Sequence, residues 1–201
     1  MALINTTTTG VLGTTVFADG SGDLTIQQNG AFVNKITSNG LTNRGTGSVL
    51  QVQNVYLTSA TQLTSAGALH ELSTSLRIAF TPVSASSTIY LECYGSFVSP
   101  GTNGLQYGAF YDVTNSAYVN LPTASGSRRQ VHFINRTTAA DINDADFMYF
   151  SVSVANTTTT ARTYTVYHST ESASLQFLVS TLSNTFGATY PLIFKITEVA
   201  T

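Results

Sequence analysis

Apolar and polar residues alternate with a two-residue period along most of the chain after residue 47. In residues 72–80 (LSTSLRIAF) every second side chain is apolar or threonine, until Thr81-Pro82 interrupts the run. In residues 89–97 the apolar side chains Leu91 and Cys93 alternate with Tyr90 and its polar neighbours. This period places successive side chains on opposite faces, so both segments are predicted to be half-buried β-strands.

Further segments of the same kind follow at short intervals. They cover residues 49–57, 105–111, 117–121, 130–136, 147–154, 162–169, 174–180 and 192–199. About ten short strands separated by turns are typical of an antiparallel β-sandwich or jelly roll, and the fold class is therefore all-β. Helix is expected only as one or two turns near 66–72 or 139–146.

The first 47 residues have a different pattern. Glycines recur through them, and Asn29-Gly30 and Asn39-Gly40 are turn signals between the short apolar–polar pieces 15–17, 24–28 and 32–36. Such strands are too short to form a core of their own. Residues 1–47 are therefore predicted to be a Gly/Thr-rich β-hairpin arm or short shaft, and residues 48–201 a C-terminal β-sandwich knob. The alternative for 1–47 is a flexible leader.

Charged residues are scarce, and hydroxyl residues take their place. The chain of 201 residues has 8 Lys and Arg and 10 Asp and Glu, against 33 Thr and 22 Ser. The β-branched threonine favours strands. Natural sheets protect exposed edges with lysine, and this chain has only Lys35 and Lys195. The composition favours a protein whose surface is covered in an assembly, which argues against an isolated enzyme.

Several partners and compartments are excluded by charge and hydropathy. The net charge is -2, and no basic patch exists beyond Arg128-Arg129, so no nucleic-acid binding is expected. No segment approaches the ~20 apolar residues of a membrane span, and the N-terminus lacks the features of a secretion signal. Cys93 is predicted to be a small buried hydrophobe, with a reactive thiol as the alternative.

Residues that carry catalytic or metal chemistry are few. His70, His132 and His168 lie far apart and are expected to be packed or rim histidines. The chain has no nucleophile elbow, phosphate-binding loop or dinucleotide motif. We therefore predict no enzyme activity, no cofactor and no metal. The acidic segment with Asp141, Asp144 and Asp146 is compatible with calcium but lacks the EF-hand glycine and distal glutamate, so a solvated loop with an aspartate cap is the alternative.

Tyrosines are the most distinctive candidates for contact with a partner. Tyr90, Tyr94, Tyr107 and Tyr111 lie close together in sequence, and tyrosine supplies rigid amphipathic contact area. We expect them at an interface between subunits, because Tyr90 and Tyr94 share the face opposite Leu91. A receptor-binding surface is the alternative.

The turn-rich segments 100–106 and 123–129 are candidates for contact with a host surface. The second is the most cationic segment of the chain, with Arg128 and Arg129 following Ser125, and Asn103 lies in the first. Exposed loops commonly carry recognition, and arginine binds anionic sugar groups. These four residues are the predicted receptor contacts. A solvated pair of arginines is the alternative.

Five segments together resemble a known family. They are GSVLQVQNVYLTSATQLTS (48–66), LRIAFTPVSASSTIYLECYGSF (76–97), LQYGAFYDVTNSAYV (105–119), TTTTARTYTVYH (157–168) and PLIFKITEVA (191–200). Their order is similar to that of the C-terminal β-sandwich in many bacteriophage tail fibres, especially those of marine and cyanobacterial phages. Residues 16–36 resemble the hairpins that precede such domains. The insertion at 137–146 and the short N-terminal arm depart from the pattern.

The resemblance implies a virion component made in the host cytoplasm and placed on the tail or capsid surface. It implies a homotrimer that contacts other virion proteins through residues 1–47. A tail fibre would bind a surface polysaccharide or an outer-membrane receptor. The alternatives are a head fibre or capsid decoration protein, and an enzyme that degrades surface glycans.

Overall fold

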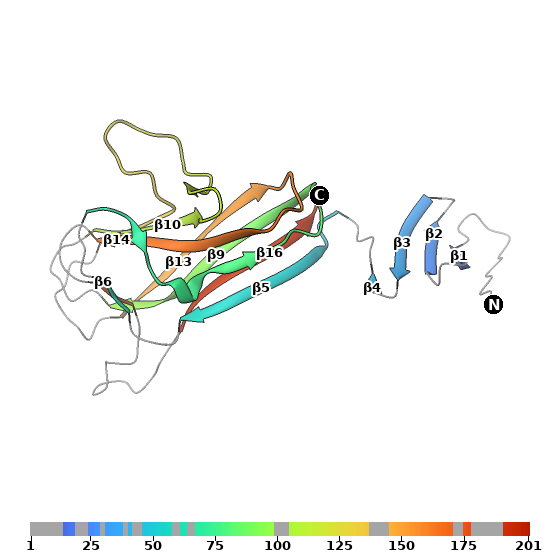
Figure 1. The fold of residues 1–201 in the computed structure, drawn as a ribbon, viewed down its shortest axis with the longest axis horizontal. Coiled ribbons are helices and arrows are strands. Elements are labelled where there is room, and N and C mark those ends of the chain that lie inside the picture. Colours follow the sequence, from blue (N-terminus) through green and yellow to red (C-terminus); the bar gives the residue numbers. More distant parts are fainter. Residues whose placement is uncertain are drawn as a thin grey trace. The chain divides into compact units, whose positions relative to one another are not determined.

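The structure is a computed structural model that divides the chain into two units. Residues 1–50 together with Val199–Thr201 form the first, and Gln51–Glu198 form the second. Side chains are described for residues 46–57, 67–96, 105–136, 147–170 and 191–201, and the strands outside these ranges are described by their backbone. Figure 1 shows the elements in chain order.

An antiparallel four-stranded sheet lies in the first unit, and its strands follow one another in the order β1-β2-β3-β4. Strands β2 and β3 pair on either side of Asn29-Gly30, the predicted turn, beginning with Gln28 opposite Ala31. The bounds are β1 Thr14–Ala18, β2 Leu24–Gln28, β3 Ala31–Thr37 and β4 Gly40–Leu41.

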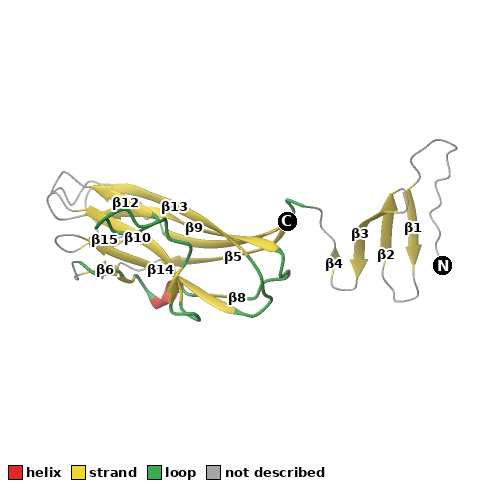
Figure 2. Ribbon diagram, turned by 90° about the horizontal axis from the view of Figure 1, so that it is seen from above, coloured by secondary structure: helices red, strands yellow, loops and turns green. Residues whose placement is uncertain are grey.

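Two sheets make up the second unit (Figure 2). The first, here the β10–β14 sheet, has the order β11-β10-β14-β7, with β12 also paired to β10 and β8 to β14. Its strands are β7 His70–Glu71, β8 Ile78–Phe80, β10 Leu105–Asp112, β11 Ala117–Tyr118, β12 Phe133–Arg136 and β14 Arg162–Thr170.

The second sheet, here the β9–β13 sheet, has the order β5-β16-β9-β15-β6, and β13 pairs antiparallel with β9 along its whole length. Its strands are β5 Val49–Leu57, β6 Thr61–Leu63, β9 Ser87–Val98, β13 Ala145–Ala155, β15 Leu175–Phe177 and β16 Leu192–Ala200. The predicted all-β sandwich is confirmed.

Aromatic rings join the two sheets at the centre of the core. The Phe110 ring, from β10, lies 4.7 Å from the Phe150 ring and 5.7 Å from the Phe194 ring of the opposite sheet. These three belong to a cluster of buried side chains that draws on both sheets. Because each strand alternates, its second set of side chains faces outward, and the functional surfaces are built from that set.

Strand β9 shows the alternation clearly. Leu91 and Cys93 are fully buried, whereas Tyr90 is 41% exposed. Burial raises the pKa of the Cys93 thiol far above its usual value, so the buried-hydrophobe prediction for this residue is confirmed. Strand β9 passes very close to β16 at Gly95, where a Cβ atom would lie 2.8 Å from the Cα of Leu192. Only glycine fits at this crossing.

The prediction of one continuous strand over 72–80 is wrong. The segment contains a 3₁₀ turn, η1 (Thr74–Leu76), between β7 and β8. The Ser73 hydroxyl accepts a hydrogen bond from the Ser75 amide and begins the turn. Serine side chains compete in this way with ladder hydrogen bonds. Leu72 and Leu76 remain buried, so the apolar spacing also fits a turn. No helix forms at 67–72, and 137–144 lies outside the described residues.

One buried carboxylate joins the last strand to the turn before β9. The Glu198 side chain is fully buried and accepts hydrogen bonds from Gln51 Nε2 (2.7 Å), the Val83 amide (2.8 Å), the Ser84 amide (3.0 Å) and Ser87 Oγ (2.6 Å). Burial raises the pKa of this carboxyl, but the four hydrogen bonds outweigh that effect and leave the pKa below its usual value. Glu198 therefore stays ionised inside the fold.

His168 is another ionisable group on the inner side of a sheet. It continues the buried face of Tyr164 and Val166 on β14, and it is 1% exposed. Burial lowers the pKa of the imidazole to about 3, so the ring is neutral near pH 7.

Replacing Glu198 with Gln should destabilise the sandwich strongly. The side-chain NH₂ group of the glutamine would replace one carboxylate oxygen and face N–H and O–H donors. Buried amides of the 81–87 turn would therefore lose their acceptor. We expect the free energy of unfolding at pH 7 to fall by about 3 kcal/mol, measured by urea denaturation. Glu71→Gln is the matched control, because Glu71 is only partly buried, and about 1 kcal/mol or less is expected. Equal losses would contradict this role for Glu198.

Stability should also fall as the solution is acidified. The folded pKa of His168 lies below its unfolded value, so its contribution is complete above pH 6.5 and declines from there down to about pH 3. At pH 5 the loss should be about 2 kcal/mol. Glu198, whose folded pKa is also depressed, adds a loss below its unfolded pKa, at lower pH. In the His168→Leu variant the unfolding midpoint should change less between pH 7 and pH 5 than in the wild type. An unchanged pH dependence of the midpoint would rule out this assignment.

Candidate recognition surfaces

The outer face of the β10–β14 sheet carries a group of tyrosines with one arginine. Gly108 and Phe110 of β10 point toward the opposite sheet, so Tyr107 and Tyr111 point outward. Tyr167 of β14 lies opposite Ala109, and Tyr118 of β11 lies opposite Tyr111. We call Tyr107, Tyr111, Tyr118, Tyr167 and Arg129 the tyrosine–arginine face.

Three of these rings contact one another. Tyr111 and Tyr167 are stacked with ring centroids 4.3 Å apart, and Tyr118 meets both edge-on, at 5.1 Å from Tyr111 and 5.7 Å from Tyr167. Burial is the main cause that raises the pKa of Tyr118 and of Tyr167, so both hydroxyls remain protonated donors near neutral pH. This tyrosine cluster is a rigid, partly exposed aromatic platform.

Arg129 is held in place beside the cluster. Its guanidinium carbon lies 4.5 Å from the centroid of the Tyr107 ring, and Nη1 donates a hydrogen bond to Ser169 Oγ (3.1 Å). The positive charge of Arg129 also acts to lower the pKa of Tyr118, which places it near the cluster. A cation over an aromatic face is stabilised by the ring quadrupole.

Two other charges near this face, those of Arg77 and Glu71, neutralise each other, whereas the adjacent Arg128 is exposed. Arg77 Nε and Nη2 each donate to Glu71 at 2.7 Å, and Thr165 Oγ1 donates to the same carboxylate at 3.1 Å. The hydrogen bond from Arg77 is the largest cause that lowers the pKa of Glu71. A paired arginine has little capacity for a further anion, so Arg129 is the better candidate for binding one.

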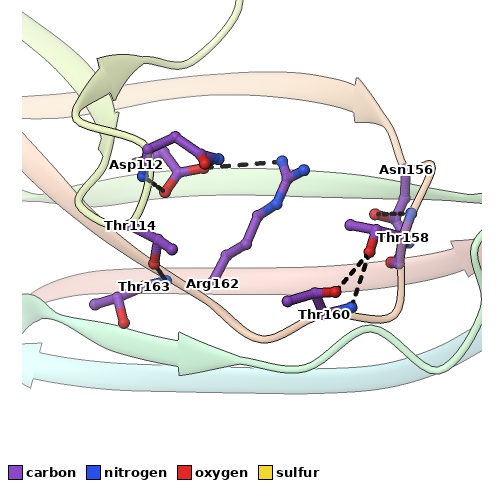
Figure 3. A network of polar contacts seen from close by, with 8 residues as sticks. Asp112, Thr114, Asn156, Thr158, Thr160, Arg162 and Thr163 are labelled. Atoms are coloured by element: carbon purple, nitrogen blue, oxygen red, sulfur yellow. Dashed lines mark hydrogen bonds and ion pairs between the residues drawn. The ribbon is translucent and has the colours of Figure 1, made fainter.

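A pocket of about 220 Å³ adjoins the tyrosine cluster, because Tyr118 lines both. Asp112 and Arg162 lie in its wall, with Arg162 Nη1 3.8 Å from Asp112 Oδ2 (Figure 3). Asn115 donates two hydrogen bonds to the Asp112 carboxylate, one from its backbone amide and one from its side-chain Nδ2. The two charges in the pocket therefore compensate each other, and its remaining polar capacity comes from side-chain amides and hydroxyls.

The threonine-rich segment 156–163 beside the pocket is held by hydrogen bonds within the segment and by one to Thr114, 49 residues away in the chain. Thr158 Oγ1 accepts from the Thr160 amide (3.0 Å), Asn156 Nδ2 donates to the Thr158 carbonyl (2.8 Å), and the Thr163 amide donates to Thr114 Oγ1 (2.8 Å), as Figure 3 shows. Hydroxyl residues substitute here for charged ones in ordering a loop.

The outer face of the β9–β13 sheet is aromatic and more exposed. Tyr149 lies opposite Tyr94 and is 55% exposed, while Phe147 lies opposite Ser96 and is 59% exposed. An ion pair on this face joins Lys195 Nζ to Glu92 Oε2 at 2.6 Å. We call Tyr90, Tyr94, Phe147 and Tyr149 the aromatic face. An exposed apolar patch with its charge paired is typical of a surface that another protein covers.

The structure divides the tyrosines predicted for one interface. Tyr90 and Tyr94 lie on the aromatic face, whereas Tyr107 and Tyr111 lie on the outer face of the other sheet, so the four do not form one surface. Tyr107 is 9% exposed and is covered partly by Arg129 of its own chain.

The predicted receptor contacts also differ from one another. Arg128 and Ser125 are exposed, and the Arg128 amide donates to the Ser125 carbonyl at 3.3 Å. Arg129, in contrast, is built into the face just described. Asn103 lies outside the described residues.

The structure brings two of the three histidines together, because His70 of β7 lies opposite His168 of β14 in the strand register, whereas His132 lies before β12. His70 is exposed at β7, and His132 accepts a hydrogen bond from the Phe110 amide through Nδ1 (3.1 Å), which joins the preceding loop to β10. Burial is the largest cause that lowers the pKa of His132. Within the described residues, no three His, Cys, Asp or Glu side chains come together as a metal site. Asp141 and Asp144 lie outside these residues, and only the backbone of Asp146 is described.

Sequence reasoning missed Tyr167, Phe147 and Tyr149. The alternation in each strand already assigns them to the outer side, because their neighbours in the chain, Val166, Met148 and Phe150, are buried. Their partners depend on strand register across segments far apart in the chain, and a single sequence does not contain that information.

Comparisons with known proteins give limited results. No family model and no curated protein matches the chain. Among solved structures, a chain from infectious bursal disease virus, Gx strain, is similar with a TM-score of 0.45 and 11% identity, over 90% of this chain and 52% of that one. A chain from the T13 particle of that virus is similar with a TM-score of 0.43 and 12% identity, over 89% and 45%.

The chain thus spans about half the length of the solved chains it resembles. In the part of the chain that the structure describes, no helix is long and apolar enough to cross a membrane.

Proposed function

We propose that this protein is a non-enzymatic virion structural protein of the phage tail-fibre type, in which the β-sandwich is a host-binding knob and residues 1–47 are the attachment arm. The observation that carries the proposal is the exposure of the aromatic face on a chain with only 9% charged residues. A surface of that kind favours association, and the family resemblance of the sequence agrees with it.

In this proposal the two outer faces have different partners. The aromatic face contacts further copies of the same chain, and the assembly is a homotrimer. The tyrosine–arginine face stays open to a polysaccharide or outer-membrane receptor of the host, because it holds the better candidate cation and a set of hydroxyl groups suited to recognition.

A capsid role is the second candidate. The same arm and knob would serve a head fibre or a decoration protein that stabilises the capsid, and the compensated charges on the aromatic face are compatible with packing on a protein lattice. The position of the protein on the particle distinguishes the two roles.

The purified protein should be a trimer that depends on the aromatic face. Light scattering should give about three times the chain mass of 21.3 kDa. Tyr149→Arg should reduce this to a monomer, because it places a long charged side chain in a contact that the trimer would bury. Val83→Arg is the matched control, since Val83 is 63% exposed but lies in the turn before β9. A wild-type monomer at micromolar concentration, or equal effects of both variants, would reject the interface.

Deleting residues 1–47 should leave a folded knob that is absent from particles. The arm has its own short sheet, so the sandwich should keep a cooperative thermal transition. Antibody-gold labelling should detect the full-length protein at the tail of virions and no truncated protein on them. Labelling on the capsid would select the decoration role, and absence of the full-length protein from particles would refute a virion function.

A further inference from the structure

We propose that the tyrosine–arginine face is a binding site for an acidic oligosaccharide, in which Arg129 binds a sugar carboxylate and the tyrosine cluster supports the neighbouring sugar rings. The inference rests on the proposed function and names the ligand class that the open face of the knob would take.

The charge at this face is available for a ligand. A guanidinium has five N–H donors, and one of Arg129 is used by Ser169. In the described part of the chain no carboxylate lies within ion-pair distance of Arg129, whereas Arg77, Arg162 and Lys195 each have one. A planar guanidinium with free donors binds a carboxylate with two parallel hydrogen bonds.

The position of Arg129 is fixed before a ligand arrives. The Tyr107 ring supports one side of the guanidinium, and Ser169 holds one nitrogen. An arginine already ordered by its own chain loses less entropy on binding than a solvated one. The adjacent Arg128 has the same charge and is exposed, but among the described residues its side chain makes no hydrogen bond, ion pair or ring contact. The two arginines therefore differ in order and not in charge.

The rest of the site suits sugar rings. The stacked pair Tyr111 and Tyr167 gives a rigid flat surface on which the apolar face of a pyranose can lie, and Tyr118 adds an edge and a hydroxyl. Tyr107 and Tyr111 are four residues and about 13 Å apart on β10, with Arg129 near the Tyr107 end, while Tyr107 is 9% exposed and Ala109 between them is buried. That length fits two or three sugar residues.

The low net charge favours binding of an acidic sugar through local geometry and disfavours general attraction of anions. The net charge of the chain is -2, and the nearby Arg77 is paired with Glu71. Long-range attraction is therefore weak, and binding depends on the local geometry at Arg129. A neutral sugar would leave the guanidinium without a partner, and a phosphate-rich polymer would gain little from a single ordered cation.

The test is calorimetric titration of the full-length protein with tetrasaccharides of galacturonate, mannuronate and α2,8-linked sialic acid, each beside its methyl ester. The ester keeps the sugar and removes the negative charge. At least one acid should bind at least tenfold more tightly than its ester. Arg129→Gln should weaken that binding at least tenfold, while Arg128→Gln, with the same change in charge, should alter it less than twofold.

Further measurements keep the outcome clear. Arg129→Lys, which keeps the charge but not the planar fork, should also lose binding, and the melting temperatures of the three arginine variants should match the wild type. Absence of binding to every acid, equal binding of acid and ester, or equal losses in both Gln variants would overturn the inference. None of these results affects the labelling of particles, so the proposed virion role would fail or stand separately.

Discussion

The buried carboxylate of Glu198 fixes how the strands of the sandwich lie against one another. The positions of both candidate recognition surfaces depend on that arrangement. It is anchored on the last strand and accepts two consecutive backbone amides, a serine hydroxyl and a glutamine amide from elements more than a hundred residues earlier. A group with this many satisfied hydrogen bonds fixes the start of β9 against β16. Since β9 and β13 pair along their whole length, the same contact fixes the register of the aromatic face.

That constraint explains how a chain with few charges orders its loops. Carboxylates act at a few points such as Glu198, Asp112 and Glu71, and each is shared among several donors. Elsewhere, hydroxyl groups bond to nearby backbone, as in the 156–163 loop. Local bonds of this kind need no counter-ion, so among the described residues the outer faces carry few charges, such as Arg77 with Glu71, Lys195 with Glu92 and Arg129 over Tyr107.

The sequence alone predicts the strands and their buried sides well. Leu91 and Cys93 lie inside, and Tyr90 lies outside, because alternation is a local property of each strand. It fails at 72–80, where the Ser73 hydroxyl makes a turn that apolar spacing does not exclude. It also does not show that Tyr94 and Tyr107 belong to different sheets, because sheet membership is decided by long-range pairing.

The same limit explains why Arg129 could be chosen as a candidate but not distinguished from Arg128. They are consecutive residues of the same type in a turn-rich segment, so the sequence does not distinguish them. What separates them is the pairing of Tyr107 with Ser169 across β10 and β14, which brings a ring and a hydroxyl to the same place on the outer face. Arg129 contacts both groups and is held by them. The place of Arg129 on the outer face is therefore a consequence of strand register, which the packing of Phe110 against Phe150 and Phe194 secures from inside.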